Sequence, residues 1–118
     1  MDESAIRRAL SDEREMTVRR IEAMTADFDG IVLAATDMNG DDEHDPEGST
    51  VAYERAQVAA LLHEARAYLG EIDRAEERLA EGTYSACEGC GGSIPPERLL
   101  ARPATLTCIA CATSARPG

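Results

Sequence analysis

Apolar side chains recur along residues 3 to about 36 at alternating steps of three and four residues. This spacing places them on one face of an α-helix and is typical of the seam of a two-helix coiled coil. The seam positions are Leu10, Thr17, Ile21, Met24, Phe28, Ile31 and Ala35, and Arg14 fills the one gap. The other faces are charged, so the segment is predicted to form one long helix. Gly30 is its weak point, since an interior glycine costs about 1 kcal/mol.

A second stripe of the same kind runs from about Pro46 to Glu81. Its positions are Val58, Leu62, Ala65, Leu69, Ile72 and Leu79, with Glu76 as the one polar member. Asp45 and Pro46 together are a helix start signal, because Asp accepts from free amides and Pro suits the first turn. Ser49 or Thr50 is the alternative cap. Gly82 is expected to end the helix with a positive φ.

Neither helix can bury its stripe alone. Only about ten residues join them, so they are expected to fold back on each other as an antiparallel hairpin over residues 1–82. The predicted fold is therefore all-α: a long two-helix coiled-coil hairpin followed by a small C-terminal module. A compact bundle with that module folded against it is the alternative, which we rank second because no third helical stripe is present.

All four cysteines fall in two Cys-x-x-Cys pairs, Cys87 with Cys90 and Cys108 with Cys111. Two such pairs have the ligand spacing of a four-thiolate zinc site. Two disulfides would suit a secreted domain, but the first residues lack the apolar core of a secretory signal. A thioredoxin-like redox pair would need a βαβ pattern around it. Because four thiolates close the coordination shell, we predict one structural Zn²⁺ and no catalytic metal.

Residues 83–118 are expected to fold around this zinc as a separate module, since metal binding can supply about 10–16 kcal/mol of folding free energy. The side chains expected to wrap the site are Ile94, Leu99, Leu100, Leu106 and Ile109. Gly91 and Gly92 are expected to supply positive φ after the first pair. A short helix is predicted around 97–101, between Pro96 and Pro103, and another at the second cysteine pair.

The chain carries a formal net charge of −11. Charge of this sign repels phosphate backbones, so direct nucleic-acid binding is not expected, and a basic protein surface is the more natural partner. The apolar runs are too short to cross a membrane. His44 and His63 are single histidines with no accompanying nucleophile. We therefore expect a cytoplasmic protein that is not an enzyme.

An acidic stretch near residues 37–49 joins the two predicted helices and so forms the tip of the hairpin. Its acidic members from residue 41 onward are Asp41, Asp42, Glu43, Asp45 and Glu47. A calcium loop that starts at Asp37 would need Gly at position 42 and Glu at position 48, where the chain has Asp and Gly. Two interpretations stay open: a solvated polar turn, or a working tip that the hairpin presents to a partner.

Residues 82–111 resemble the DksA/TraR family of bacterial transcription factors. The matching residues are Gly82-Thr-Tyr-Ser-Ala-Cys87-Glu-Gly-Cys90-Gly91, Ile94, Arg98-Leu-Leu-Ala-Arg-Pro103 and Cys108-Ile-Ala-Cys111. The resemblance implies a four-cysteine zinc finger with a coiled-coil arm that binds RNA polymerase rather than DNA. In that family the arm enters the secondary channel, the tip approaches the active centre, and binding can modulate responses to the alarmone ppGpp. All twelve basic residues are Arg, which fits a GC-rich genome and an actinobacterial-type member.

The tip departs from the family in one place. Well-studied members carry Asp-x-x-Asp-x-Ala there, and this chain keeps two aspartates at that spacing, Asp42 and Asp45, but has Glu47 in place of the Ala.

Two other function classes are weaker alternatives. One is a DNA-binding zinc finger, which residues 87–118 support poorly because they offer only three arginines against two glutamates. The other is a zinc-dependent adaptor that binds some other protein.

Overall fold

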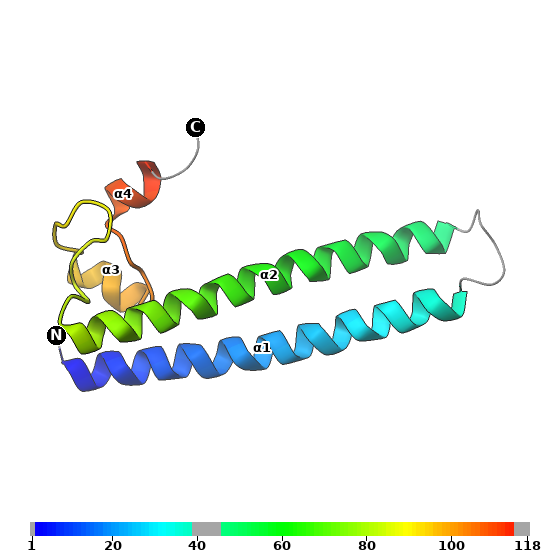
Figure 1. The fold of residues 1–118 in the computed structure, drawn as a ribbon, viewed down its shortest axis with the longest axis horizontal. Helices are drawn as coiled ribbons and strands as arrows, with labels where there is room; N and C mark the ends of the chain where they lie inside the picture. Colours follow the sequence, from blue (N-terminus) through cyan, green and yellow to red (C-terminus); the bar gives the residue numbers. More distant parts are fainter. Residues whose placement is uncertain (1, 39–45, 115–118) are drawn as a thin grey trace. The chain divides into compact units, whose positions relative to one another are not determined.

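The structure is a computed structural model that describes residues 2–38 and 46–114, and for residues 32, 34–38 and 46–49 it describes the backbone alone. It contains two long helices, α1 (Glu3–Met38) and α2 (Pro46–Glu81), and two short ones, α3 (Pro96–Ala101) and α4 (Ile109–Ser114) (Figure 1). The long helices are antiparallel and pack on each other, which confirms the predicted all-α class. Neither has an apolar stretch, within its described residues, that could cross a bilayer.

The chain divides into two compact units, and each long helix contributes to both. We call Met1–Glu15 with Tyr68–Gly118 the zinc unit, and Met16–Ala67 the hairpin unit. Among the residues that the structure describes, only the zinc unit has further segments that can pack on the pair of long helices, which accounts for the division.

In the zinc unit, the predicted seam is ion-paired where it is polar, and its apolar members are buried except Leu69 and Leu79, which are half-buried. Leu10 and Ile72 are fully buried, and Ala75 lies beside them in the core. Arg14 of α1 donates to the carboxylates of Asp73 and Glu76 of α2. The one basic break in the first stripe therefore meets the one acidic break in the second.

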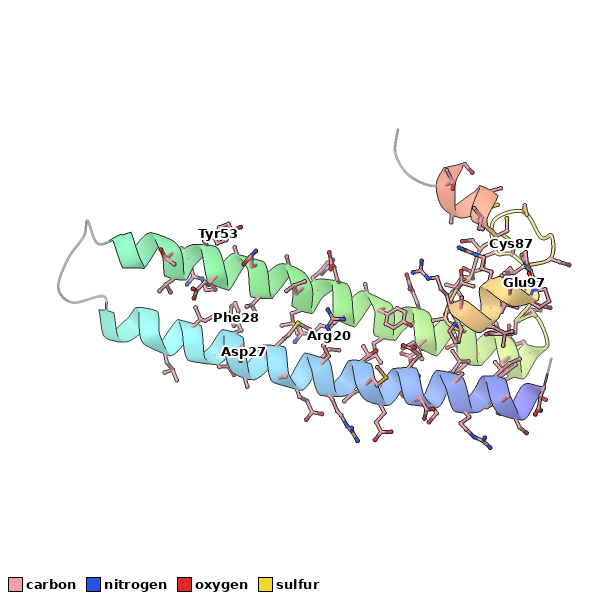
Figure 2. All side chains as sticks on the ribbon, turned by 180° about the vertical axis from the view of Figure 1, so that it is seen from behind. Arg20, Asp27, Phe28, Tyr53, Cys87 and Glu97 are labelled. Carbon is pink, nitrogen blue, oxygen red and sulfur yellow. The ribbon has the colours of Figure 1, made fainter. Side chains whose placement is uncertain are left out.

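In the hairpin unit, the seam residues are the predicted ones, but several are only half-buried. Thr17, Leu62 and Ala65 are buried, whereas Ile21, Met24, Phe28, Ile31 and Val58 are intermediate. Figure 2 shows Phe28 between the two helices and Tyr53, which is largely exposed, on the side of α2 away from α1. Two helices alone leave part of each stripe in solvent. Seam residue Ala35 lies outside the described side chains.

Gly82 ends α2 as predicted, with a φ of 82°. Its amide donates to the carbonyl of Leu79 at 3.3 Å, and the amide of Thr83 donates to the carbonyl of Arg78 at 2.9 Å. This is the Schellman pattern, in which a left-handed residue turns the chain off the helix axis and satisfies the last carbonyls. The turn directs the chain into the cysteine-bearing loops. The predicted start signal at Asp45 lies outside the described residues.

Candidate metal centre

A tight turn presents the first cysteine pair. Ala86 and Ser93 form an isolated antiparallel bridge, and between them Cys87 donates its amide to Gly92 at 2.7 Å and accepts from the amide of Gly91 at 2.9 Å. Gly91 has a φ of 75°, as predicted, whereas Gly92 does not adopt a positive φ. The expectation for Gly92 is therefore wrong: its contribution is an amide that donates to the Sγ of Cys90 at 3.4 Å.

The second pair lies at the start of α4. Cys108 directly precedes the helix and Cys111 is in its first turn, where the amide of Ala112 donates to the carbonyl of Cys108 at 2.9 Å. Residues three apart on a helical turn share one face, so both thiols point the same way. The amide of Glu88 donates to the carbonyl of Leu106 at 2.8 Å, which holds the two cysteine loops together.

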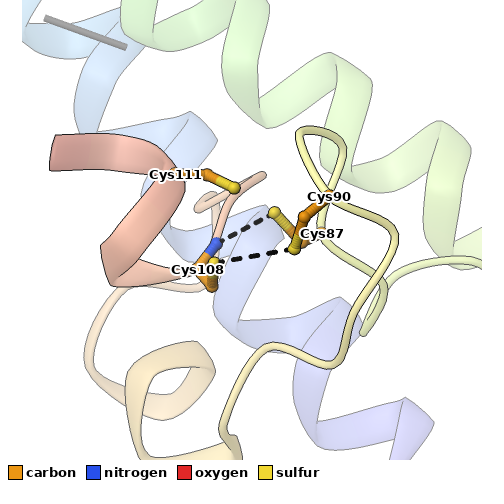
Figure 3. Close-up of side chains that lie close together, drawn as sticks. All are labelled: Cys87, Cys90, Cys108 and Cys111. Carbon is orange, nitrogen blue, oxygen red and sulfur yellow. Dashed lines mark hydrogen bonds between the residues drawn. The ribbon is translucent and has the colours of Figure 1, made fainter. Parts of the chain in front are cut away.

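The four sulfur atoms form one cluster (Figure 3), in which all lie within 4.8 Å of one another. The Sγ atoms of Cys90 and Cys108 are 3.9 Å apart. Four thiolates at about 2.3 Å from a tetrahedral Zn²⁺ would be separated by about 3.8 Å. The cluster thus fits the metal in both donor chemistry and spacing, and Cys87, Cys90, Cys108 and Cys111 form a C4 zinc site.

Backbone amides surround the sulfur atoms and favour their charged form. Cys87 Sγ accepts from the amide of Cys108 at 3.2 Å and from that of Gly89 at 3.3 Å. The amide of Cys108, followed by that of Cys90, lowers the pKa of Cys87 to about 6. The hydrogen bond to Cys87 raises the pKa of Cys111. The Cys87 thiolate therefore forms readily while Cys111 resists ionisation. Four thiolates together require a dication to offset their repulsion.

Gly89 is a requirement that sequence reasoning missed. A Cβ at this position would lie 2.9 Å from the Sγ and 3.0 Å from the Cβ of Cys111. Residue 89 lies inside the first Cys-x-x-Cys pair, so the backbone there passes directly beside the opposite pair. Any larger side chain would push the two cysteine loops apart.

The apolar surroundings of the site differ in part from the prediction. Ile94 and Leu99 are buried and Leu106 packs against the core, as expected. Leu100 and Ile109 are instead 73% and 62% exposed, so the prediction that they wrap the zinc is wrong. In a six-residue helix only one face meets the core: Leu99 occupies that face of α3, and the next residue points about 100° away.

The core beside the zinc site is shared between the module and the ends of both long helices. It consists of Leu10, Ile72, Ala75, Tyr84, Cys87, Ile94, Leu99 and Ala104. Sequence reasoning did not identify Tyr84 or Ala104. The Tyr84 hydroxyl donates to the carbonyl of Pro103 at 2.7 Å, so its ring fills the core while its polar end is satisfied.

Arginines connect the loops to the helices. Arg78, in the last turn of α2, is buried and donates to the carbonyls of Thr83, at 2.6 Å, and of Ala86. Arg98 of α3 donates through Nε to the carbonyl of Thr107 at 2.8 Å. The available sequence signal for Arg78 was its place in the final turn, where cations can satisfy terminal carbonyls.

The predicted acidic tip lies almost entirely outside the residues that the structure describes. Asp41, Asp42, Glu43 and Asp45 lie outside the described residues, and Glu47 is in the first turn of α2 with only its backbone described. Their assignment as a partner-binding tip stays a prediction.

Residues 82–116 match the family model described as "Prokaryotic dksA/traR C4-type zinc finger". The metal centre is a DksA/TraR-type zinc finger. The match covers the segment on which the resemblance was identified, and it includes all four cysteines.

Three proteins with curated sequences share part of the chain. An uncharacterized protein of Aquifex aeolicus (strain VF5) is 52% identical over 46 residues, 39% of this chain. From Bacillus subtilis (strain 168), the uncharacterized protein YteA is 42% identical over 67 residues, 56% of this chain, and general stress protein 16O is 37% identical over 65 residues, 55% of it. The matches span 32%, 28% and 40% of these relatives' own lengths.

A solved structure matches nearly the whole chain. Transcription factor DksA2 from Pseudomonas aeruginosa is 27% identical with a TM-score of 0.51, and the match covers 98% of this chain and 89% of that one. The likeness therefore extends beyond the zinc finger to both long helices. The resemblances are to a zinc finger and a transcription factor, which are non-enzymatic, in line with the prediction. The actinobacterial subtype stays a prediction.

Proposed function

We propose that this protein regulates transcription by binding bacterial RNA polymerase directly. The observation that carries the proposal is the likeness to transcription factor DksA2 over 98% of the chain, helices included. The DksA/TraR-type zinc finger supports it independently, because that match rests on residues 82–116 alone.

The charge of the chain favours a protein partner over DNA. The net charge of −11 repels phosphates, and a Zn²⁺ with four thiolates adds two more negative charges than positive ones to its module. Of the arginines in the described part of that module, Arg98 already donates to the carbonyl of Thr107. Too few cations remain to neutralise a nucleic-acid backbone.

The finer mechanism follows the family resemblance. The hairpin enters the secondary channel of the polymerase in the cytoplasm, and its acidic tip, from Asp41 to Glu47, acts near the catalytic Mg²⁺. Negative charge at that point alters the field around the metal and its basic neighbours. Binding there is also the route by which ppGpp responses could be linked to this protein.

The proposal is tested with zinc-loaded protein, purified RNA polymerase and a promoter fragment. We expect a stable complex with the polymerase, a change in transcript yield in vitro, and no retention of the fragment alone at physiological salt. Retention of DNA without polymerase would favour a DNA-binding zinc finger. Capture of unrelated proteins with no affinity for polymerase would favour an adaptor.

A further inference from the structure

The hairpin unit contains a groove that the zinc-finger function does not explain. Its volume is about 490 Å³. The residues that line it are Ala26, Asp27, Gly30 and Ile31 of α1 and Val51, Glu54, Gln57 and Val58 of α2. Its apolar surface comes from Ile31, Val51 and Val58. These side chains are all partly exposed, so the groove is an unfilled part of the seam rather than a closed cavity.

Gly30 lines the groove without a side chain. A Cβ at this position would meet nothing within 4 Å, so close packing does not require the glycine. The helix conformation does not require it either, because among the described residues only Gly82 and Gly91 have positive φ. Gly30 therefore leaves open space beside α1 that a larger side chain could occupy, although an interior glycine weakens the helix.

Two carboxylates, Asp27 and Glu54, line the same groove from opposite helices. Within the described part of the chain, neither has a hydrogen bond or an ion pair. In the zinc unit, by contrast, acids of α2 have a cation on α1: Asp73 and Glu76 both form ion pairs with Arg14. The groove therefore combines an apolar surface with two acids that lack a cation.

We infer that this groove docks a basic, partly apolar segment of RNA polymerase. The aliphatic stem of an Arg or Lys fits along Ile31, Val51 and Val58 while its charged end lies between Asp27 and Glu54. Such an arrangement buries apolar area and neutralises both acids, so it supplies affinity and selects a cationic partner. This inference rests on the proposed function and specifies where on the long helices the polymerase binds.

The first test fills the groove. Gly30→Leu places a side chain in the open space, and Gly70→Leu is its matched control, since a Cβ at Gly70 also meets nothing within 4 Å and Gly70 does not line the groove. Both variants replace a helix glycine by a good helix former and should be at least as stable as wild type. We expect Gly30→Leu to raise the Kd for purified polymerase by about tenfold, and Gly70→Leu by less than about twofold.

The second test removes the charges. Asp27→Asn/Glu54→Gln is compared with Glu22→Gln/Asp29→Asn, which changes net charge equally on exposed positions outside the groove. We expect the groove pair to weaken polymerase binding by about fivefold to tenfold at low salt, with a smaller effect at higher salt, and the control pair to have little effect.

The outcomes separate the two claims. Wild-type protein that does not bind polymerase would overturn the proposed function, and this inference with it. Wild-type binding with groove variants that behave like their controls would overturn the groove assignment alone. Groove variants that change sedimentation of the isolated protein, but not its affinity for polymerase, would make a second copy of this chain the occupant and would also overturn it.

Discussion

The zinc unit and the hairpin unit are built on the same two helices but reach different degrees of burial. Among the described side chains, the large ones that are fully buried all belong to the zinc unit: Leu10, Ile72, Ile94 and Leu99. In the hairpin unit, the described seam contains buried Thr17, Leu62 and Ala65 between half-exposed neighbours. The difference shows that a helix pair needs a third layer to form a dry core, and here loops held by a metal provide that layer.

The largest expected effect comes from removing the metal. Elemental analysis should find one zinc per wild-type chain, and Cys87→Ser or Cys108→Ser should lose it. Zinc binding can supply about 10–16 kcal/mol, so residues 83–118 should unfold while circular dichroism keeps much of its helical signal. Well under one equivalent of zinc in a wild-type protein whose C-terminal module is folded would contradict the assignment.

A smaller effect should separate the two halves of the seam. Ile72→Ala removes a fully buried side chain and should lower the free energy of unfolding by about 2–5 kcal/mol. Ile21→Ala, at a half-buried position, should cost roughly half as much because less apolar area leaves solvent on folding. Urea denaturation of both variants gives the comparison. Equal losses would mean that the hairpin unit is as well packed as the zinc unit.

Ionisation of Tyr68 should destabilise the zinc unit at high pH. Burial, and then its hydrogen bond to Glu13 at 3.0 Å, raises the pKa of Tyr68 to about 12 from an ordinary 10.0. Because the folded state favours the neutral phenol, this stabilisation is complete below pH 10 and is lost as the pH rises through about 12.

Tyr68→Phe should remove this loss of stability above pH 10. At neutral pH it should lower the free energy of unfolding by about 0.5–1.5 kcal/mol, because the hydrogen bond to Glu13 is lost. Tyr53→Phe, at an exposed position, is the control. Unfolding free energies measured from pH 8 upward test the sign: an alkaline step that persists in Tyr68→Phe must come from other groups.

The smallest effect on stability is expected from Asp42→Asn/Asp45→Asn in the predicted tip. Zinc content and melting temperature should stay unchanged, since substitutions in a solvated turn are usually within about 0.5 kcal/mol of neutral. Polymerase affinity should change modestly, whereas regulation in vitro should be lost if these acids act near the catalytic metal. Unchanged regulation with intact binding would favour the interpretation of this stretch as a solvated polar turn.

The sequence allowed most of the scaffold to be predicted. Hydrophobic periodicity defined both long helices, a glycine marked the end of α2, and cysteine spacing indicated the metal site, because each of these signals is local in the chain. Leu100, Ile109 and Gly89 could not be assigned correctly, because their surroundings depend on how distant loops meet. Arg14 and Glu76 were each visible as a polar break in a stripe, and pairing the two breaks would have predicted their ion pair.

The ion pair of Arg14 with Asp73 and Glu76 has a consequence for the register of the hairpin. These side chains are 34% to 55% exposed, so their attraction adds little to stability. Two apolar stripes, however, could slide past each other by one helical turn and still place apolar residues against apolar residues. Such a slip would set Arg14 against an apolar seam position and leave Glu76 without its cation. The ion pair thus specifies the register of the two helices, because only one alignment satisfies these charges.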